Sequence, residues 1–586
     1  MKRKLFSLAI AVAMLLTLIP GVALAYAGAD ELQNAIDSAS DGATITLTNG
    51  IFLDQKLTIS GKGVTIDGGG NTITWADTYN GTLFEVGSGA SLILKNVTID
   101  GENEFTFYND TTTVEDGKNW YTRFVDVGTE DKAINADVIV NNGNLTLGEG
   151  TVIQNVTIAS TGDNGKTANT GTGGYYLMYN DDLSVIKSNG GQVSLNGAKI
   201  TGNAGLILNA INAETTIAGA TIDSNMGCGN KGGIIIANNG TMTIDQNTSI
   251  SSNKAMARSA TILGVINGAE VEFSGTMDGN KHLGVGSNTA GAIVVLEGAS
   301  QFIMNDGSIS NNVGGRAGAI ASRWVGGSYG QHEEESIILN SGTIAGNTTT
   351  NDSWNGASIF LRSPAQINEG IDVDGDIAVN AAPGELEITG GTFNGSLSAT
   401  DGLSVEISGG IFSEDPSAYV ADDTPLSKVT DASGNTIYAV GEEATKAAAT
   451  PGSTVEVIEG SVTLNDGTTI NAGESHIVPA PAPAPAPKSS GSGIKVTYNG
   501  GNSFSTSKSA VPTSVEIDGV AVGFTGSGKL FTVNSIPAGA KWVTVRWNST
   551  SVTVNFTPSG AYFAEVEIPK TGDMPLWAGI AAVFGF

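Results

Sequence analysis

A short unit that ends in asparagine recurs through the middle of the chain and limits what the chain can fold into. The unit runs Lys, Ser or Thr, then Ile or Met, then two short residues, then Asn. Its closing residues are Asn203, Asn225, Asn253, Asn280, Asn312 and Asn347. A repeat of roughly 20 to 35 residues built from short alternating strands predicts a β-solenoid, in which each coil covers the apolar face of its neighbour. The 80 glycines in 586 residues supply the tight turns between such strands.

The closing asparagines have a structural role at the corner of a coil. Asn tolerates the left-handed backbone conformation, and its amide can bond the neighbouring backbone. Stacked on successive coils, these side chains are expected to form an asparagine ladder. The alternative, that each one binds a ligand, is less favoured.

The segment Asp30–Ala39 predicts a short amphipathic helix ahead of the first coil. Asp30 is expected to cap its N-terminus. The apolar positions share one face, namely Leu32, Ala35, Ile36 and Ala39. A strand pattern over Thr44–Thr48 follows at once. A capping helix that leads into such coils resembles the right-handed parallel β-helix proteins of the pectin-lyase-like fold over residues 28–412, a resemblance that implies a fold without implying a function.

The predicted architecture is therefore all-β, with a right-handed parallel β-helix, an N-terminal capping helix, a Pro-Ala linker and a small C-terminal β-sandwich. The expected segments are a signal peptide (1–25), the β-helix (28–412), a short β segment and connector (413–478), the linker (479–490), the sandwich as a stalk (491–567) and a terminal sorting signal (568–586). Alternating proline in the linker favours an extended, semi-rigid spacer.

The N-terminus has the order of a secretory signal peptide. Basic residues at 2–4 precede an apolar core over Leu5–Ile19, and small residues lead to an expected cleavage after Ala25, with Ala27 as the alternative. The formal charge of −30 excludes nucleic acid as a partner, because such a surface repels polyanions. The single cysteine, Cys228, excludes an internal disulfide framework.

The C-terminus resembles the sorting signal of Gram-positive cell-wall proteins. The pentapeptide comprises Ile568, Pro569, Lys570, Thr571 and Gly572, and an apolar tail follows it. The resemblance implies cleavage by sortase between Thr571 and Gly572 and transfer to peptidoglycan, with only transient membrane contact through the signal peptide and the tail. Ile568 stands where Leu is commoner, the tail is shorter than a membrane-spanning helix, and no basic residue ends it.

Polygalacturonases of this fold carry four catalytic motifs, and three of them are missing from the sequence. The fourth, Asp-Asp, occurs as Asp181-Asp182 in an insertion, with no catalytic partner recognisable in the sequence. There is no Asn-Thr-Asp, Gly-His-Gly or Arg-Ile-Lys, and the histidines are only His282, His332 and His476. No catalytic residue is therefore assigned. The 58 acidic residues leave carboxylate-pair hydrolysis open, because sequence is silent on their separation in space.

One acidic stretch is a weak candidate for Ca²⁺, and no other cofactor is expected. Asp372, Asp374 and Asp376 alternate along the chain and would share one face of a strand. Carboxylate oxygens suit Ca²⁺, but the position of the glycine does not match an EF-hand loop. A solvated turn is the favoured alternative.

Aromatic residues gather in three insertions, at 102–132, 160–182 and 316–335. The candidate glycan-binding residues are Trp120, Tyr121, Tyr175, Tyr176, Tyr179, Trp324 and Tyr329. Aromatic rings offer flat apolar platforms to sugars, and insertions in solenoids often build the binding face. The alternative is that each ring packs beneath its own loop.

These features together predict an exported, wall-anchored adhesin or glycan-binding display protein, with a polysaccharide or a host or matrix glycoprotein as its ligand. A polysaccharide lyase or glycosidase is the first alternative, and a purely structural wall component is the second.

Overall fold

The protein was analysed as a computed structural model. The structure describes residues 22–24, 26–103, 106–107, 125–126, 134–158, 183–229, 233–257, 262–282, 291–322, 337–350, 357–380, 385–479, 496–500, 502–507, 509, 512–536, 540, 542–547 and 550–555. It divides into two compact units, residues 1–478 and 479–586.

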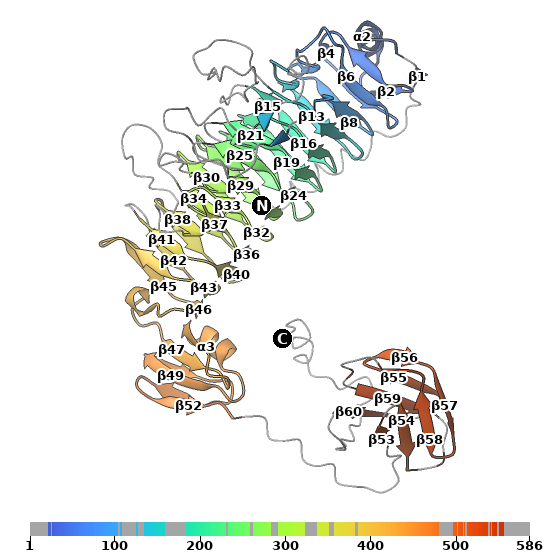
Figure 1. The fold of residues 1–586 in the computed structure, drawn as a ribbon. Coiled ribbons are helices and arrows are strands. Elements are labelled where there is room, and N and C mark those ends of the chain that lie inside the picture. The colour runs from blue at the N-terminus through green and yellow to red at the C-terminus, as the bar shows by residue number, and fades with distance from the viewer. Residues whose placement is uncertain are drawn as a thin grey trace. The chain divides into compact units, whose positions relative to one another are not determined.

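The first unit is a parallel β-helix, as the sequence predicted (Figure 1). Each coil passes through three parallel sheets, named here A, B and C in the order in which the chain enters them. Sheet A contains, in order, β1 (Val22–Leu24), β2 (Ala43–Leu47), β5 (Gly63–Asp67), β8 (Ser91–Lys95), β13 (Asn144–Leu147), β16 (Gln192–Asn196), β19 (Glu214–Ala218), β23 (Thr241–Ile244), β27 (Glu270–Phe273), β31 (Gln301–Met304), β35 (Ile337–Leu339), β39 (Ala365–Ile367), β42 (Glu385–Ile388) and β45 (Ser404–Ile407).

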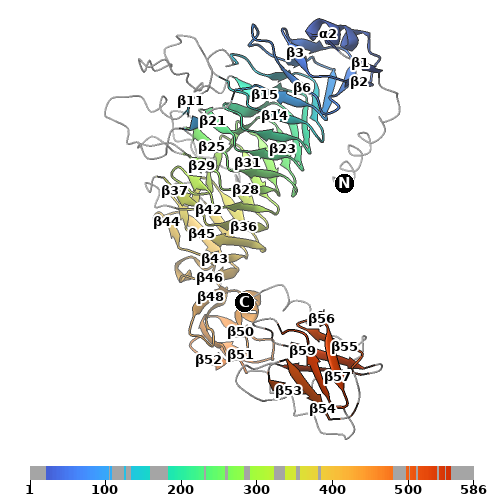
Figure 2. The same cartoon turned by 45° about the vertical axis from the view of Figure 1, so that its right-hand side comes forward.

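Sheets B and C accompany sheet A along the stack of coils (Figure 2). The parallel part of sheet B contains β3 (Ile51–Leu53), β6 (Thr72–Trp75), β9 (Thr98–Asp100), β14 (Val152–Gln154), β17 (Lys199–Thr201), β20 (Thr221–Asp223), β24 (Ser249–Ser251), β28 (Thr276–Asp278), β32 (Ser308–Ser310), β36 (Gly342–Ala345), β40 (Ile371–Asp374), β43 (Thr392–Asn394) and β46 (Gly410–Phe412). Sheet C contains β4 (Leu57–Ile59), β7 (Phe84–Val86), β12 (Ile139–Asn141), β15 (Ser184–Asn189), β18 (Leu206–Ile211), β22 (Ile235–Asn238), β26 (Leu263–Ile266), β30 (Val294–Glu297), β34 (Ile320–Ser322), β38 (Ile359–Leu361), β41 (Ile377–Val379) and β44 (Leu397–Ala399).

Two smaller sheets occur along the solenoid. A short parallel sheet between sheets B and C contains β21 (Met226–Gly229), β25 (Lys254–Ala257), β29 (Lys281–His282), β33 (Val313–Gly314) and β37 (Thr348–Thr349). Within the first aromatic insertion, β10 (Thr106–Phe107) pairs antiparallel with β11 (Val125–Asp126).

The interior is a continuous apolar core made by alternate residues of the strands. In sheet B the inward residues stack in one unbroken column, namely Ile200, Ile222, Ile250, Met277, Ile309, Ile344, Val373 and Phe393. All are buried, and each such side chain contributes about 1.5–3 kcal/mol relative to exposure. The Phe393 ring stacks on Phe412, with centroids 4.7 Å apart.

The expected asparagine ladder is present on six successive coils. The Oδ1 of Asn253 accepts hydrogen bonds from both the backbone N–H and the Nδ2 of Asn225, each at 3.0 Å. The Nδ2 of Asn253 in turn donates to Oδ1 of Asn280 at 3.0 Å and to the Ile222 carbonyl at 2.8 Å. The same pattern runs from Asn203 to Asn347. Each amide therefore ties its own coil to its neighbours.

The left-handed backbone at this corner belongs to the residue before each ladder asparagine, which differs from the expectation. These residues are Gly202, Ser224, Ser252, Gly279, Asn311 and Gly346, with φ between 56° and 64°. The turn there orients the next side chain inward, so the ladder asparagine itself is buried in the stack.

The N-terminal end is capped by α2 (Ala29–Ser38), whose predicted apolar face packs on the core through Leu32 and Ile36. The expected cap at Asp30 is wrong, because Gly28 holds the N-cap position and no side chain bonds there. The side-chain amide of Gln33 both donates to the Thr58 carbonyl at 3.0 Å and accepts from the Thr58 N–H at 2.8 Å. It thereby occupies the open edge of β4, the first strand of sheet C.

The helix C-terminus is held by a lysine from the coil below. Lys62 Nζ donates to the carbonyls of Ile36, Asp37 and Ala39 at 3.2, 2.7 and 2.9 Å. The ammonium therefore binds carbonyls of the last helical turn and of the C-cap residue Ala39, and it lies at the negative end of the helix dipole.

Residues 413–478 form a folded C-terminal cap rather than only a short β segment and connector. After η5 (Ser417–Tyr419) come β47 (Leu426–Thr430), β48 (Thr436–Val440), α3 (Glu442–Ala448), β49 (Thr454–Glu459), β50 (Ser461–Thr463), β51 (Thr469–Asn471) and β52 (Ser475–Ile477). Strand β48 pairs antiparallel with β46 and covers the last edge of sheet B. The Tyr419 hydroxyl accepts from Ala399 N–H at the edge of sheet C, and Ala421 N–H donates to Ile407 in sheet A.

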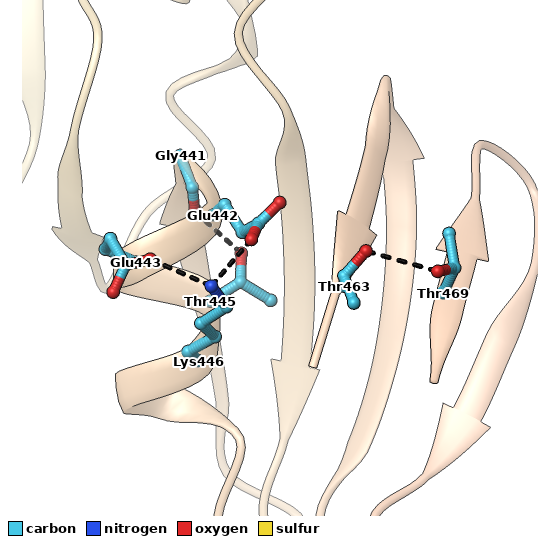
Figure 3. Close-up of polar contacts among 7 residues, drawn as sticks. All are labelled: Gly441, Glu442, Glu443, Thr445, Lys446, Thr463 and Thr469. Carbon is cyan, nitrogen blue, oxygen red and sulfur yellow. Dashed lines mark hydrogen bonds and ion pairs between the residues drawn. The ribbon is translucent and has the colours of Figure 1, made fainter. Parts of the chain in front are cut away.

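Local polar contacts stabilise helix α3 itself and the neighbouring β50–β51 pair within this cap (Figure 3). Lys446 lies between the carboxylates of Glu442 and Glu443, at 2.6 and 2.8 Å. The buried Thr445 hydroxyl donates to the Gly441 carbonyl at 3.0 Å, and the Thr463 and Thr469 hydroxyls meet across β50 and β51 at 3.1 Å.

The second unit contains the predicted small β-sandwich. One sheet contains β53 (Val496–Gly500), β54 (Ser503–Thr506), β58 (Leu530–Val533) and β57 (Phe524–Ser527). The other contains β56 (Val520–Val522), β55 (Ser514–Ile517), β59 (Trp542–Trp547) and β60 (Thr550–Asn555). Phe504 and Phe531 stack within its core, with centroids 5.3 Å apart. Among the helices that the structure describes, none has the length and apolar character of a membrane span.

Candidate functional site

Two of the three aromatic insertions leave the solenoid from the same corner of neighbouring coils. The first lies between β9 of sheet B and β12 of sheet C, and the second between β14 and β15 of the same two sheets. Strands β9 and β14 pair directly, as do β12 and β15. The bases of these insertions are therefore one strand spacing apart, about 4.8 Å.

The third insertion has a different origin. Most of it falls between β34 of sheet C and β35 of sheet A, which is another corner of the coil. It also begins several coils further along the stack. Only the first two insertions therefore start close enough together to form a single binding face.

The predicted glycan-binding rings fall outside the described residues. They are Trp120, Tyr121, Tyr175, Tyr176, Tyr179, Trp324 and Tyr329. The expected cleavage residue Ala25 and the sorting pentapeptide 568–572 also fall outside them. Just before Ala25, Val22–Leu24 form β1 and pair with β2, so the end of the expected signal peptide lies against the first coil.

A polar cluster joins the two neighbouring insertions where the chain re-enters sheet C. Asp137 follows the first insertion, and Ser184 follows the second. Oδ1 of Asp137 accepts from the Ser184 N–H at 2.7 Å and from its hydroxyl at 3.3 Å. Oδ2 lies 3.7 Å from Lys187 Nζ, with both side chains largely buried. The carboxylate therefore fixes one re-entry point to the other.

Burial raises the pKa of Asp137 above its ordinary value, outweighing the Lys187 charge and the Ser184 hydrogen bonds, which lower it. A carboxyl group that is protonated more readily than usual, at the base of a loop cluster, is a recognised candidate for binding or proton transfer. Sequence reasoning missed this cluster because its members are 47 residues apart in the chain.

The start of the first insertion carries a second buried polar group. Asn103 is 1% exposed, and its side-chain amide has no hydrogen-bond partner in the described part of the chain. Its backbone N–H donates to the Asn155 carbonyl in the next coil at 3.1 Å.

The acidic stretch considered for Ca²⁺ is divided by the end of a strand. Asp372 and Asp374 project outward from β40, but Asp376 lies beyond Gly375, after the strand has ended. Asp374 accepts from Asn394 Nδ2 at 2.9 Å, and Asp376 accepts from the Ser396 N–H at 2.7 Å. Within the described ranges, no group of three acidic, histidine or cysteine side chains is arranged to hold a metal ion.

Register also brings one carboxylate pair together on the outer face of sheet A. Glu387 of β42 lies opposite Glu406 of β45, and both are exposed. The described histidines are separate from this pair: His282 is buried on β29, and His476 lies in the C-terminal cap, 3.6 Å from Asp466.

Comparison of the chain with protein-family models, curated proteins and solved structures found no match in any of the three.

Proposed function

We propose that this protein is an exported, cell-wall-anchored adhesin or glycan-binding display protein. The observation that carries the proposal is the common origin of the first two aromatic insertions, on neighbouring coils and at one corner. Aromatic-rich segments with adjacent bases can contribute to one binding surface, and the Asp137 cluster holds those bases in register.

The location is proposed from the two termini. A signal-peptide pattern precedes the solenoid, and the Pro-Ala linker, the sandwich and the Ile-Pro-Lys-Thr-Gly pentapeptide follow it. In this arrangement sortase would join Thr571 to peptidoglycan, and the linker and the sandwich would act as a stalk. Contacts repeated over many displayed copies would raise the avidity of individually weak binding.

The experiment that tests this proposal incubates residues 26–567 with a panel of host and plant polysaccharides in the presence of Ca²⁺. Retained protein and newly released chain ends are scored together. Retention without release is expected. Replacing residues 160–182 with a short Gly-Ser loop should reduce retention, whereas the same replacement of 323–336 should reduce it less, because that insertion leaves from another corner. Equal effects would contradict the common binding surface.

A polysaccharide lyase or glycosidase is the second candidate, and the raised pKa of Asp137 is the observation that favours it. A carboxyl group whose pKa is raised stays protonated to a higher pH than usual and can act as a general acid. Release of chain ends that Asp137→Asn abolishes, with retention unchanged, would establish this alternative. If the protein is not retained and no chain ends are released, the result would favour the third possibility, a structural wall component.

A further inference from the structure

An exposed phenylalanine lies at the N-terminal end of sheet B, away from the insertions. Phe52 is the central residue of β3 and is 59% exposed. It is the single aromatic among the large hydrophobic side chains exposed in the described ranges. Its neighbours Ile51 and Leu53 point into the core, so strand alternation directs Phe52 outward.

Phe52 begins a column of polar side chains on the outer face of sheet B. Thr74 lies opposite Phe52, is only 5% exposed, and donates its hydroxyl to the Asp100 carbonyl at 2.6 Å. Asp100 pairs with Gln154, and Gln154 with Thr201. Four strand spacings separate Phe52 from Thr201, about 19 Å. This set, Phe52, Thr74, Asp100, Gln154 and Thr201, is called the Phe52 column below.

Hydrogen bonds hold the polar part of the column in place. Gln154 Nε2 donates to Oδ2 of Asp100 at 2.7 Å, and Asn155 Nδ2 donates to Oδ1 at 3.1 Å. Because Nε2 is engaged, the amide plane of Gln154 is fixed and its carbonyl oxygen is directed elsewhere. Pre-ordered polar groups lose little entropy when they bind a ligand.

Short turns bound one side of the column. The chain passes from sheet A to sheet B through these turns, whereas the first two insertions begin beyond the opposite ends of β9 and β14. Strand β8 ends at Lys95 and β9 begins at Thr98, and β13 ends at Leu147 while β14 begins at Val152.

We infer that the Phe52 column is a binding site for a linear neutral polysaccharide lying along the solenoid axis. The Phe52 ring offers an apolar platform for one sugar face, and Asp100, Gln154 and Thr201 offer hydrogen bonds to hydroxyl groups at successive strand spacings. The column contains a carboxylate and no cation, within a chain of net charge −30, so it suits an uncharged chain and disfavours a polyuronate. This inference rests on the proposed glycan-binding function and adds a second, independent site.

The test measures binding of residues 26–567 to linear neutral β-glucan oligosaccharides, with polygalacturonate in parallel. Phe52→Ala is expected to weaken affinity roughly 3- to 10-fold, since one aromatic contact contributes about 0.5–1.5 kcal/mol beyond its buried area. Phe52→Trp should restore affinity, and its indole fluorescence should shift on titration with the glucan. Ile477→Ala, which removes an equally exposed apolar side chain in the C-terminal cap, is the matched control and should have no effect.

A second variant separates ring stacking from a general effect on folding. Thr201→Arg, four strands from Phe52, should obstruct the far end of the column and weaken longer oligosaccharides more than short ones. Equal affinity of Phe52→Ala and the unmodified protein would overturn the inference, as would tighter binding of polygalacturonate. Loss of self-association in place of loss of glycan binding would show that a second copy occupies the face.

The two proposals fail in different ways. If the protein binds no glycan at all, the proposed function fails and this site fails with it. If replacement of residues 160–182 removes binding and Phe52→Ala does not, only the present inference is overturned.

Discussion

At the scale of single residues, buried polar side chains carry much of the specificity of this fold. Each ladder asparagine satisfies groups on two neighbouring coils, so its removal leaves several buried donors and acceptors unpaired. Asp137 is the contrasting case, because its carboxylate is buried beside a cation and its pKa is nevertheless raised.

The ladder predicts a large loss of stability from one substitution. Asn253→Ala would leave the Asn225 N–H and Nδ2 and the Ile222 carbonyl without their partner. We expect a loss of about 3 kcal/mol or more, since each unsatisfied buried group costs about 1–3 kcal/mol. Urea unfolding of residues 26–478 would measure it. Asn247→Ala, at an exposed position on the same coil, is the control, expected within about 0.5 kcal/mol; equal losses would contradict the role of the ladder.

The Asp137 carboxyl predicts a pH dependence of stability. Its pKa is raised in the folded state, so the folded protein binds this proton more tightly than the unfolded chain does. The stabilisation is present below the unfolded pKa of about 3.9 and is lost as pH rises through the folded value. Asp137→Asn should therefore raise the urea midpoint at pH 7 and leave it nearly unchanged near pH 3. A lower midpoint at pH 7 would show that the Lys187 ion pair outweighs burial. The exposed Asp372→Asn is the control.

At the scale of elements, the ends of the solenoid decide whether the stack of coils is soluble. Open edges of parallel sheets recruit other strands, and proteins commonly cover them. Here α2, through Gln33, occupies the first edge of sheet C, and residues 413–440 contact the last strand of all three sheets.

The lysine that holds the C-terminus of α2 gives a prediction at this scale. Lys62→Met keeps the aliphatic stem and removes three hydrogen bonds to helix carbonyls. We expect a loss of roughly 1–2 kcal/mol and faster amide exchange over residues 29–39. Lys56→Met is the matched control, because it removes only an exposed ion pair with Glu85, worth less than about 1 kcal/mol. Equal exchange in the two variants would contradict the capping role.

At the scale of the whole molecule, the chain is modular. The solenoid and its C-terminal cap form one compact unit, and the residues beyond Val478 form another. A boundary in this position separates the part that folds around the long core from the part proposed as a stalk.

The modular division predicts opposite outcomes for two truncations. A chain that ends at Val478 keeps every edge contact of the cap and should stay monomeric, with the thermal midpoint of the solenoid unchanged. A chain that ends at Phe412 loses β48 and Tyr419 and exposes the last strand of each sheet. We expect it to aggregate in size-exclusion chromatography. A monomeric shorter chain would contradict the need for the cap.

The proposed cell-wall anchoring by the C-terminal sorting signal is tested separately in cells. Thr571→Ala removes the threonine side chain next to the expected cleavage site, which the resemblance to sortase substrates requires. The protein should therefore move from the wall fraction to membrane or medium. The neighbouring Lys570→Ala is the control, since any residue is allowed at that position of the motif. Unchanged wall retention of Thr571→Ala would reject anchoring by sortase.

Local periodicity determined much of this fold directly from the sequence. The asparagine repeat predicted the solenoid and its ladder, and alternation predicted the strands at Ser514–Ile517 and Trp542–Trp547. These patterns can be read locally because a strand exposes alternate residues and a helix exposes every third or fourth. The expected signal peptide and sorting signal are likewise encoded in short runs of consecutive residues, and export and anchoring remain predictions.

Only the tertiary structure decided which distant residues meet. The three insertions look alike in sequence, yet two of them leave from one corner of the coil and the third leaves from another. The sequence does not predict this difference, because loops of unequal length make it impossible to assign each insertion to its position in a coil. The Asp137–Ser184 contact and the outward position of Phe52 in line with Thr201 depend on how coils stack. The cap at 413–478 was likewise not recognised, since its antiparallel strands gain their role only by meeting the end of a parallel stack. Such contacts depend on register between coils, and no single segment of the chain contains that information.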